Sequence, residues 1–197
     1  MNPRVVTALV LAAALASGAV IAAAGGGEQD TVPAGPFEGA VIPAGVRAPD
    51  FTLRDQDGEK VSLRSFRGSP VVVAFMYATC EDSCPPQAQQ VKGALDDLGR
   101  DVPVLAVSVD PRGDTPRAAR RFLLEQRMTG RMRFLLGERG DLAPVWRGFA
   151  VQPQSRDTEH QARTVLVDRD GFQRVGFPLS QTTPERLEHD LRILLAE

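Results

Sequence analysis

The two cysteines of the chain, Cys80 and Cys84, lie four positions apart, between an apolar run and a segment with helical periodicity. A spacing of four places two side chains on one face of a helix, and in a loop it still lets both sulfurs reach one small ligand. Such a pair can close a disulfide or bind a soft metal ion. A purely structural disulfide is the simplest alternative, although a bridge across so short a loop stabilises a fold little.

The segments around the cysteines predict a strand-helix-strand unit. Residues 70–76 contain a continuous apolar run rich in β-branched side chains, which is typical of a central strand buried on both faces. Residues 87–98 have one apolar helical face, and residues 101–110 repeat the strand pattern. The three segments predict a right-handed crossover between parallel strands. The cysteines then lie beyond the carboxyl end of the first strand, where α/β folds place reactive groups.

The remaining elements complete the predicted fold. They are a β-hairpin around the turn at 55–58, a helix at 115–127 capped by Thr115, a strand at 132–136, a helix at 141–149 capped by Asp141, a second hairpin formed by 163–168 and 173–177, and a helix at 184–195 capped by Thr183. We therefore predict an α/β, thioredoxin-like fold for residues 47–197. It has a central mixed sheet flanked by helices and an N-terminal β-hairpin extension.

The N-terminal part differs in kind from this domain. Residues 5–24 are apolar over a length that spans a bilayer as a helix. Because signal-peptide apolar cores usually run to about 7–15 residues, residues 1–27 are predicted to be a transmembrane anchor, with a cleaved signal peptide as the alternative. Residues 28–46 are typical of a flexible linker. We expect the domain on the extracytoplasmic side of the cell membrane, or secreted after cleavage, where thiols oxidise unless a reductant or a metal protects them.

Net charge and histidine content limit which partners and ligands the sequence supports. A formal net charge of −2 gives no electrostatic argument for nucleic acid. Thiolates select Cu(I), and one added imidazole gives a site that also holds Cu(II). Of the two histidines, His189 lies in the predicted C-terminal helix, where a solvated face is its simplest placement. His160 directly precedes the strand at 163–168, in a loop that faces the cysteines in a thioredoxin-like fold, so it is a geometrically reasonable third ligand.

A peroxidase is an alternative, because peroxiredoxins share this fold and the opening Ala-Pro-Asp-Phe-Thr-Leu at 48–53. Peroxiredoxins carry P-x-x-x-T-x-x-C before the attacking cysteine. In this chain Tyr77 stands three residues before Cys80, and Glu81 stands three before Cys84. Neither cysteine has the signature, which makes a peroxidase the minority interpretation.

Three motifs, in order along the chain, resemble the Sco/SenC family. They are the Cys80–Cys84 segment followed by Pro85, the run Ser-Val-Asp-Pro-Arg-Gly-Asp-Thr-Pro at 108–116, and Glu-His at 159–160 before a strand ending in Asp-Arg-Asp-Gly at 168–171. The resemblance covers about residues 47–197. It implies a membrane-tethered, thioredoxin-like copper protein that assembles cytochrome c oxidase, with Cys80, Cys84 and His160 as ligands of one copper ion.

The resemblance also implies partners. The protein would deliver copper to the CuA centre of cytochrome c oxidase subunit II, or reduce the cysteines there as a thiol-disulfide oxidoreductase. In the second case Cys80 and Cys84 are catalytic and His160 is dispensable. Another copper chaperone or a thiol reductant would be a further partner. A third hypothesis is an interaction or sensor protein whose signal is copper or redox state.

The chain departs from the family at Glu81, where proline is usual, and at Glu159 and Gln161, where aspartate and a small hydroxyl residue are common. None of these departures removes a ligand. Because carboxylates disfavour a nearby thiolate, Glu81 and Asp82 are expected to raise the pKa of both thiols. The metal-free pair would then be less nucleophilic than in relatives, which favours copper handling over disulfide exchange.

Two further groups lie near the predicted site. Asp110 and Asp114 bracket a turn beyond a strand end, with turn formation and helix capping as their simplest role and support of the site or partner docking as the alternative. A basic helix face is expected to be solvated, with docking to an acidic partner as its alternative. It consists of Arg117, Arg120, Arg121 and Arg127.

Overall fold

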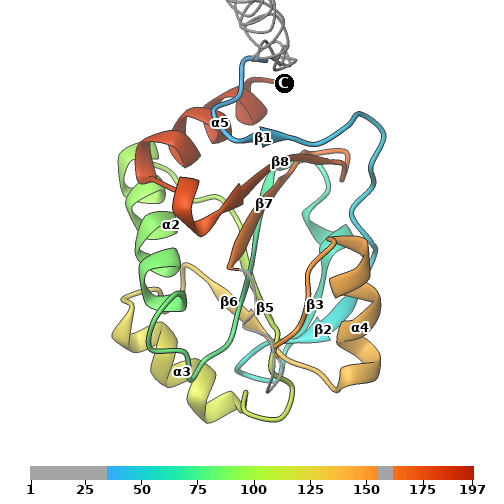
Figure 1. Cartoon of the computed structure of the whole chain (residues 1–197), viewed down its shortest axis with the longest axis vertical. Coiled ribbons are helices and arrows are strands. Elements are labelled where there is room, and N and C mark those ends of the chain that lie inside the picture. Colours follow the sequence, from blue (N-terminus) through green and yellow to red (C-terminus); the bar gives the residue numbers. More distant parts are fainter. Residues whose placement is uncertain (1–34, 155–161) are drawn as a thin grey trace, which may run out of the picture. The chain divides into compact units, whose positions relative to one another are not determined.

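A six-stranded sheet runs through the part of the chain that this computed structural model describes, residues 35–154 and 162–197 (Figure 1). Its strand order is β1-β8-β7-β4-β5-β6, and a separate two-stranded sheet pairs β2 with β3. The strands are β1 (Ala40–Val41), β2 (Thr52–Arg54), β3 (Lys60–Ser62), β4 (Val71–Met76), β5 (Val104–Ser108), β6 (Arg133–Leu135), β7 (Arg163–Val167) and β8 (Gln173–Pro178). The helices are α2 (Cys84–Leu98), α3 (Pro116–Glu125), α4 (Arg139–Gly148), α5 (Pro184–Ala196) and the 3₁₀ turns Leu63–Phe66 and Leu179–Gln181.

β4 lies inside the sheet because all six of its residues are apolar and buried. It pairs in parallel with β5 and antiparallel with β7, while β7 and β8 form the antiparallel hairpin. The predicted crossover from β4 through α2 to β5 is therefore confirmed. The mixed sheet with flanking helices confirms the thioredoxin-like prediction, and the β2–β3 hairpin is the predicted N-terminal extension.

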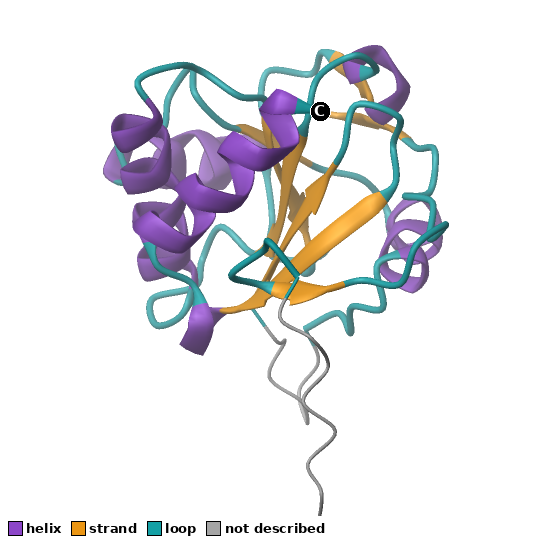
Figure 2. Ribbon diagram, turned by 90° about the horizontal axis from the view of Figure 1, so that it is seen from above, coloured by secondary structure: helices purple, strands orange, loops and turns teal. Residues whose placement is uncertain are grey.

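Alternate residues of β4 supply two apolar cores. Ala74 and Met76 pack in the core shared with α2, α3 and α5. Val73 and Phe75 pack on the other face, with α4 and the β2–β3 hairpin. Figure 2 shows the resulting layers, with helices on both sides of the sheet. Because β4 is packed on both faces, its position in the sheet is fixed, and so is the point at which the cysteine-bearing segment begins.

Two helices, α2 and α4, begin earlier than predicted. α2 begins at Cys84 rather than at residue 87, because Pro85 and Pro86 fit the first turn of a helix, where no intrahelical N–H bond is needed. α4 begins at residue 139 after Glu138, so Asp141 lies in its first turn and is not its cap. The predicted caps of α3 and α5 are confirmed, since Thr115 accepts the N–H of Ala118 and Thr183 accepts the N–H of Arg186.

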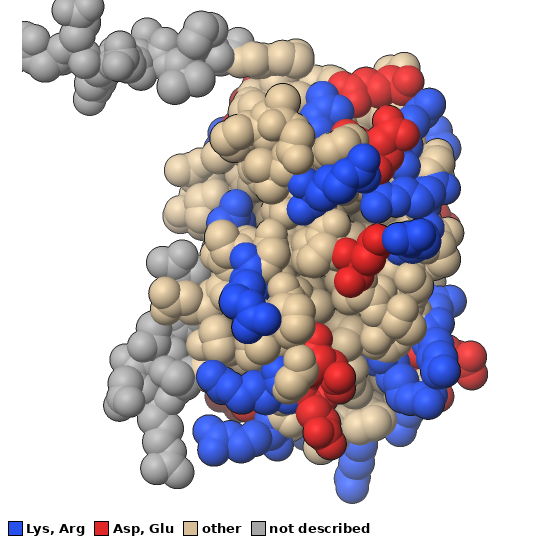
Figure 3. All heavy atoms as spheres, turned by 90° about the vertical axis from the view of Figure 1, so that its right-hand side faces the viewer, with Lys and Arg blue, Asp and Glu red and all other residues tan. Residues whose placement is uncertain are grey.

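The surface over α4 carries charges of both signs. Figure 3 shows Lys and Arg side chains lying beside Asp and Glu side chains on that face.

Among the described residues, no helix is long and apolar enough to cross a membrane. The predicted anchor at residues 5–24 lies outside the described part of the chain.

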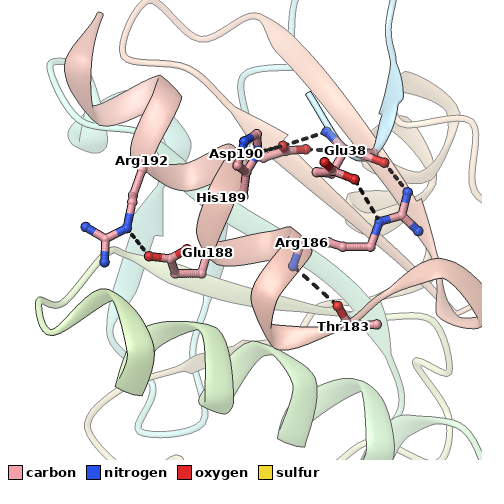
Figure 4. Close-up of polar contacts among 8 residues, drawn as sticks. Glu38, Thr183, Arg186, Glu188, His189, Asp190 and Arg192 are labelled. Atoms are coloured by element: carbon pink, nitrogen blue, oxygen red, sulfur yellow. Dashed lines mark hydrogen bonds and ion pairs between the residues drawn. The ribbon is translucent and has the colours of Figure 1, made fainter. Parts of the chain in front are cut away.

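The N-terminal residues of the described chain are held by a buried carboxylate of α5 (Figure 4). Asp190, with no exposed surface, accepts the N–H groups of Glu38 at 2.7 Å and Gly39 at 3.0 Å. The next residues form β1, which pairs with β8. The structured unit thus begins at Gly35, earlier than the predicted boundary at residue 47. Residues 35–46 were predicted to be part of a linker because they contain few aromatic residues. Their order comes from hydrogen bonds to distant parts of the chain, α5 and β8, which the local sequence does not indicate.

Candidate metal and thiol site

The cysteine loop, residues 77–83, connects the carboxyl end of β4 to α2. The N–H of Cys80 donates to the carbonyl oxygen of Tyr77 at 3.2 Å, which closes a tight turn. Cys84 is the first residue of α2, so the helix rather than the loop holds the second sulfur. The structure therefore brings both cysteines together at the strand end, as the sequence predicts.

The two cysteines are buried, are not joined in a disulfide and interact directly with each other. The backbone N–H of Cys84 donates to the Sγ of Cys80 at 3.2 Å, and the Ser83 hydroxyl lies 3.5 Å from the same sulfur. Cys84 has no exposed surface, whereas Cys80 is 6% exposed. Cys80 is therefore the more accessible of the two sulfurs.

The thiols titrate in opposite directions. A hydrogen bond from Cys84 lowers the pKa of Cys80, and bonds from Ser83 and from backbone N–H groups add to this effect against the opposing effect of burial. The same bond between the cysteines, together with burial, raises the pKa of Cys84. The thiolate consequently forms on Cys80 while Cys84 keeps its proton. Burial also raises the pKa of Tyr77, whose hydroxyl stays neutral beside the pair.

The expectation that Glu81 and Asp82 raise both thiol pKa values is wrong for Cys80. Hydrogen bonds within the loop outweigh the nearby carboxylates, and the backbone of Asp82 itself contributes to lowering the Cys80 pKa. The raised pKa of Cys84 comes from Cys80 and from burial instead. The expectation that the metal-free pair is less nucleophilic than in relatives, which favoured copper handling over disulfide exchange, therefore loses its basis.

Asp114 holds the cysteine loop from behind. Its carboxylate accepts the Ala78 N–H at 2.6 Å and the Ser108 hydroxyl at 2.5 Å, and its side chain is almost fully buried. Burial raises the pKa of Asp114 to about 6, against the lowering effect of these hydrogen bonds. Support of the site, the alternative considered for Asp114, is therefore the role its contacts show. Asp110 shapes the preceding turn, where its carbonyl oxygen accepts the Asp114 N–H at 2.9 Å.

Gln87 joins α2 to β7 beneath the cysteines. It is fully buried one turn after Cys84, and its Nε2 donates to the Thr164 hydroxyl at 3.1 Å. Its Oε1 has no hydrogen-bond partner among the described residues. Sequence reasoning missed this residue, although a glutamine on the apolar face of a helix, between Cys84 and Val91, is a detectable signal.

The histidines do not complete the site within the described chain. His160 lies outside the described residues, so its role as a ligand stays a prediction. His189 lies on α5, with Nδ1 3.0 Å from the buried Asp190. In the part of the chain that the structure covers, no three potential ligands among His, Cys, Asp and Glu cluster together. The donor set that is described, two sulfurs at a strand end, suits a soft cation such as Cu(I).

A groove opens beside Cys80, with a volume of about 540 Å³. The cysteine loop and Pro85 form one wall, and α3 forms the other. We call it the Cys80 groove. Its lining includes one thiol, four charged side chains and one aromatic ring, from Cys80, Glu81, Arg117, Arg121, Glu125 and Phe122.

The chain is similar to known proteins in both sequence and structure. A SCO1 protein homologue of Bacillus subtilis is 30% identical over 131 residues, which cover 61% of this chain and 68% of the homologue. Bradyrhizobium japonicum ScoI, solved with copper bound, superposes with a TM-score of 0.65 at 30% identity, covering 76% of this chain and 99% of that structure. BsSco, a Sco family oxidase assembly protein with a disulfide switch, gives a TM-score of 0.68 at 25% identity, covering 79% and 96%.

Peroxiredoxins also match, over a smaller share of their length. The chain is 30% identical to peroxiredoxin Q of Gentiana triflora, covering 67% of this chain but 57% of that protein. The sequence model of the SCO1/SenC family, by contrast, matches residues 42–196, almost all of the structured unit. The chain is therefore a member of the SCO1/SenC family.

Proposed function

We propose that the chain binds one copper ion through Cys80, Cys84 and His160 and delivers it to the CuA site of cytochrome c oxidase subunit II. The observation that carries the proposal is the pair of interacting thiols at the end of β4, with Cys84 fully buried and Cys80 6% exposed. Thiolates are the ligands that Cu(I) prefers, and an imidazole from His160 extends the site to Cu(II). The copper-bound relative supports the same cargo.

The described geometry suits capture and release of such a cargo. Cys80 is the thiolate that meets copper first, and Cys84 releases its proton as it becomes the second ligand. Transfer requires no catalytic base. It requires that the acceptor's ligands replace those of the chain one at a time, and the 6% exposure of Cys80 provides the point of first contact.

Location and loading belong to the same proposal. The apolar residues 5–24 would tether the domain to the cell membrane on its extracytoplasmic side, close to a membrane-bound oxidase. Release of a secreted domain is the alternative. Another copper chaperone would load the site, or a thiol reductant would keep its cysteines reduced, since free thiols oxidise outside the cytoplasm.

Copper stoichiometry of the reduced full chain tests the proposal. We expect about one copper per wild-type chain, loss of Cu(I) binding in Cys84→Ser, and loss of Cu(II) but not Cu(I) binding in His160→Ala. His189→Ala is the matched control, because it removes the other histidine and should leave both oxidation states bound. Unchanged Cu(II) binding in His160→Ala would exclude the three-ligand site.

A thiol-disulfide oxidoreductase is the second candidate, favoured by the opposite pKa shifts of the two thiols. The Cys80 thiolate would attack a disulfide of the acceptor and form a mixed disulfide, and one acceptor thiolate would leave. Cys84, after losing its proton, would attack Cys80, releasing the acceptor's second thiolate and leaving a Cys80–Cys84 disulfide. The disulfide switch of BsSco is consistent with such a reaction. If the wild type takes up no copper yet reduces the acceptor, this function replaces the first.

A further inference from the structure

The Cys80 groove is the route by which another protein can reach the site. Cys80 lines it, while Cys84 is fully buried behind. Phe122 and Pro85 add apolar lining, and their positions are fixed by the α3 core and the first turn of α2. A volume of about 540 Å³ is in the range that accommodates a ligand of several side chains. The groove therefore has room for a segment of a partner, not only for an ion.

The charges around the groove contrast with those of the whole chain. The chain has a formal net charge of −2, yet residues 115–127 carry four arginines against one glutamate, a formal charge of +3. Arg117 forms no ion pair with another described residue, while Arg121 pairs with Glu125 at 2.7 Å along the helix surface. Exposed pairs of this kind are weak, so both arginines can turn to an incoming carboxylate.

An exposed apolar side chain accompanies these arginines. Leu124, on α3, is 71% exposed, more than any other large apolar side chain among the described residues. Exposed apolar surface rimmed by charge is typical of protein interfaces. Arg120 binds the carbonyl oxygen of Gln56, which ties this face of α3 to the β2–β3 hairpin and keeps it in place.

We propose that α3 and the Cys80 groove form the docking surface for the acceptor protein, and that the acceptor presents acidic residues beside its own metal-binding cysteines. This inference rests on the proposed function. The acceptor's carboxylates bind Arg117 and Arg121, an apolar side chain covers Leu124, and the acceptor's cysteines enter the groove at Cys80. Complementary charges would steer the encounter and set its orientation.

A membrane surface is the less suitable occupant of the same face. Glu81 and Glu125 also line the groove, and an anionic lipid surface would repel them. The hydrogen bond to Glu125 and the nearby charge of Glu81 raise the pKa of Arg121. Positive and negative side chains are therefore interleaved along this groove. A folded partner can match such a pattern residue by residue, whereas a lipid surface of uniform charge cannot.

Charge reversal on α3 tests the docking surface. The full chain, its Arg117→Glu and Arg121→Glu variants and the double variant are loaded with copper and titrated with the soluble CuA domain of subunit II at low and high ionic strength. The matched control is Arg192→Glu on α5, which also breaks an ion pair with a glutamate four residues away. In Figure 1, α5 lies at the upper end of the picture and α3 at the lower end.

We expect each α3 reversal to lower the association rate constant about tenfold at low ionic strength, and the double variant to lose most of its salt dependence. Copper stoichiometry should stay at the wild-type value in all variants, which separates this test from that of the proposed function. The docking surface is wrong if copper-loaded wild type and α3 variants bind the CuA domain equally, or if the copper-loaded wild type does not bind it. It is also wrong if the α3 reversals instead remove the salt-dependent part of binding to phosphatidylglycerol vesicles while leaving the CuA domain bound.

Discussion

The carboxylate of Asp114 accepts the backbone N–H of Ala78, with 2.6 Å between nitrogen and Oδ1. The same carboxylate accepts the hydroxyl of Ser108, the last residue of β5. The segment that leads into α3 is thereby bonded to the cysteine loop, two residues before Cys80. Because the pair of thiols is positioned by backbone N–H groups, any shift of this loop changes the sulfur environment.

Replacing Asp114 by alanine should loosen the loop more than it unfolds the domain. The Ala78 N–H and the Ser108 hydroxyl each lose an acceptor, for an expected loss of about 2 kcal/mol in the free energy of unfolding at about pH 5. Amide hydrogen exchange should accelerate more at Ala78 than at the residues of β4. Asp110→Ala is the control, since Asp110 lies in the same turn but does not contact the loop backbone through its carboxylate. Unchanged exchange at Ala78 would show that Asp114 does not hold the loop.

Asp114 should also give the folded domain a pH dependence. Burial raises its pKa to about 6, whereas an unfolded aspartate has a pKa of about 3.9. Because the folded state binds this proton more tightly, the stabilisation is fully present below about pH 4 and is lost as the pH rises through about 6. The difference of about two pKa units corresponds to an upper bound of about 3 kcal/mol.

Denaturant unfolding of the metal-free, reduced chain between about pH 4 and pH 8 measures this effect. In Asp114→Asn the side chain stays neutral, and its Oδ1 still accepts the Ala78 N–H, so we expect the wild type to lose stability relative to this variant as the pH rises. The Asp110→Asn variant removes a charge that contributes to raising the Asp114 pKa, so it should show a smaller pH dependence than the wild type, in the same direction. Parallel curves for wild type and Asp114→Asn would mean that Asp114 is ionised at the same pH in both states.

The two thiols should differ in reactivity. Iodoacetamide at neutral pH should modify Cys80 first and at least tenfold faster than Cys84, because the thiolate is the nucleophile and Cys84 is both protonated and fully buried. Peptide mapping by mass spectrometry distinguishes the two products. In denaturant the rates should become equal, which is the control for intrinsic reactivity. Equal rates in the folded chain, or faster labelling of Cys84, would contradict the described arrangement.

Gln87 and Thr164 should behave as one energetic unit. In Gln87→Leu the Thr164 hydroxyl loses its donor, and in Thr164→Val the Gln87 amide is left buried without an acceptor, so each single variant should lose about 1–2 kcal/mol. The double variant replaces both groups by apolar ones and should be more stable than the sum of the single changes predicts, by about 1 kcal/mol. Denaturant unfolding of the four proteins gives this coupling, and strict additivity would show that the bond contributes nothing.

Local patterns in the sequence were enough to predict the frame of the fold and the place of the thiols. The apolar run of β4 marks a buried strand, and Thr115 and Thr183 mark helix starts, because each of these signals lies within a few residues. The helix at 87–98 was predicted from its apolar face alone, and the true start at Cys84 precedes that face, with Pro85 and Pro86 in the first helical turn.

The contacts that tune the site join residues far apart in the chain. Asp114 is 36 positions from Ala78, and Gln87 is 77 positions from Thr164. A single sequence indicates that a buried polar residue needs a partner, but the packing of the sheet decides which partner it meets. The pKa expectation for Cys80 failed for the same reason, since it counted the neighbouring charges in the sequence and not the N–H groups that the fold directs at the sulfur.

We call the contact of Asp190 on α5 with the backbone of residues 38–39 the clasp, and it can be tested directly. Asp190 is buried and accepts two backbone N–H groups, from Glu38 and Gly39, while the exposed His189 contributes a third contact. In Asp190→Asn one oxygen becomes an NH₂ group, so one of the two backbone donors must face another donor and lose its acceptor. We expect amide exchange at Glu38 and Gly39 to rise at least tenfold and pairing of β1 with β8 to weaken.

His189→Ala is the matched control for the clasp, because it removes the exposed contact and leaves both backbone bonds. The hydrogen bond to Asp190 raises the pKa of His189, so this contact is strongest below the pKa of an unfolded histidine and is lost as the pH rises through the higher folded value. His189→Ala should therefore abolish only a pH-dependent part of the protection, whereas Asp190→Asn should lose protection at every pH. If Asp190→Asn instead accelerated exchange equally in β4 and at residues 38–39, Asp190 would support the whole domain, and the N-terminal segment would not be a separately released unit.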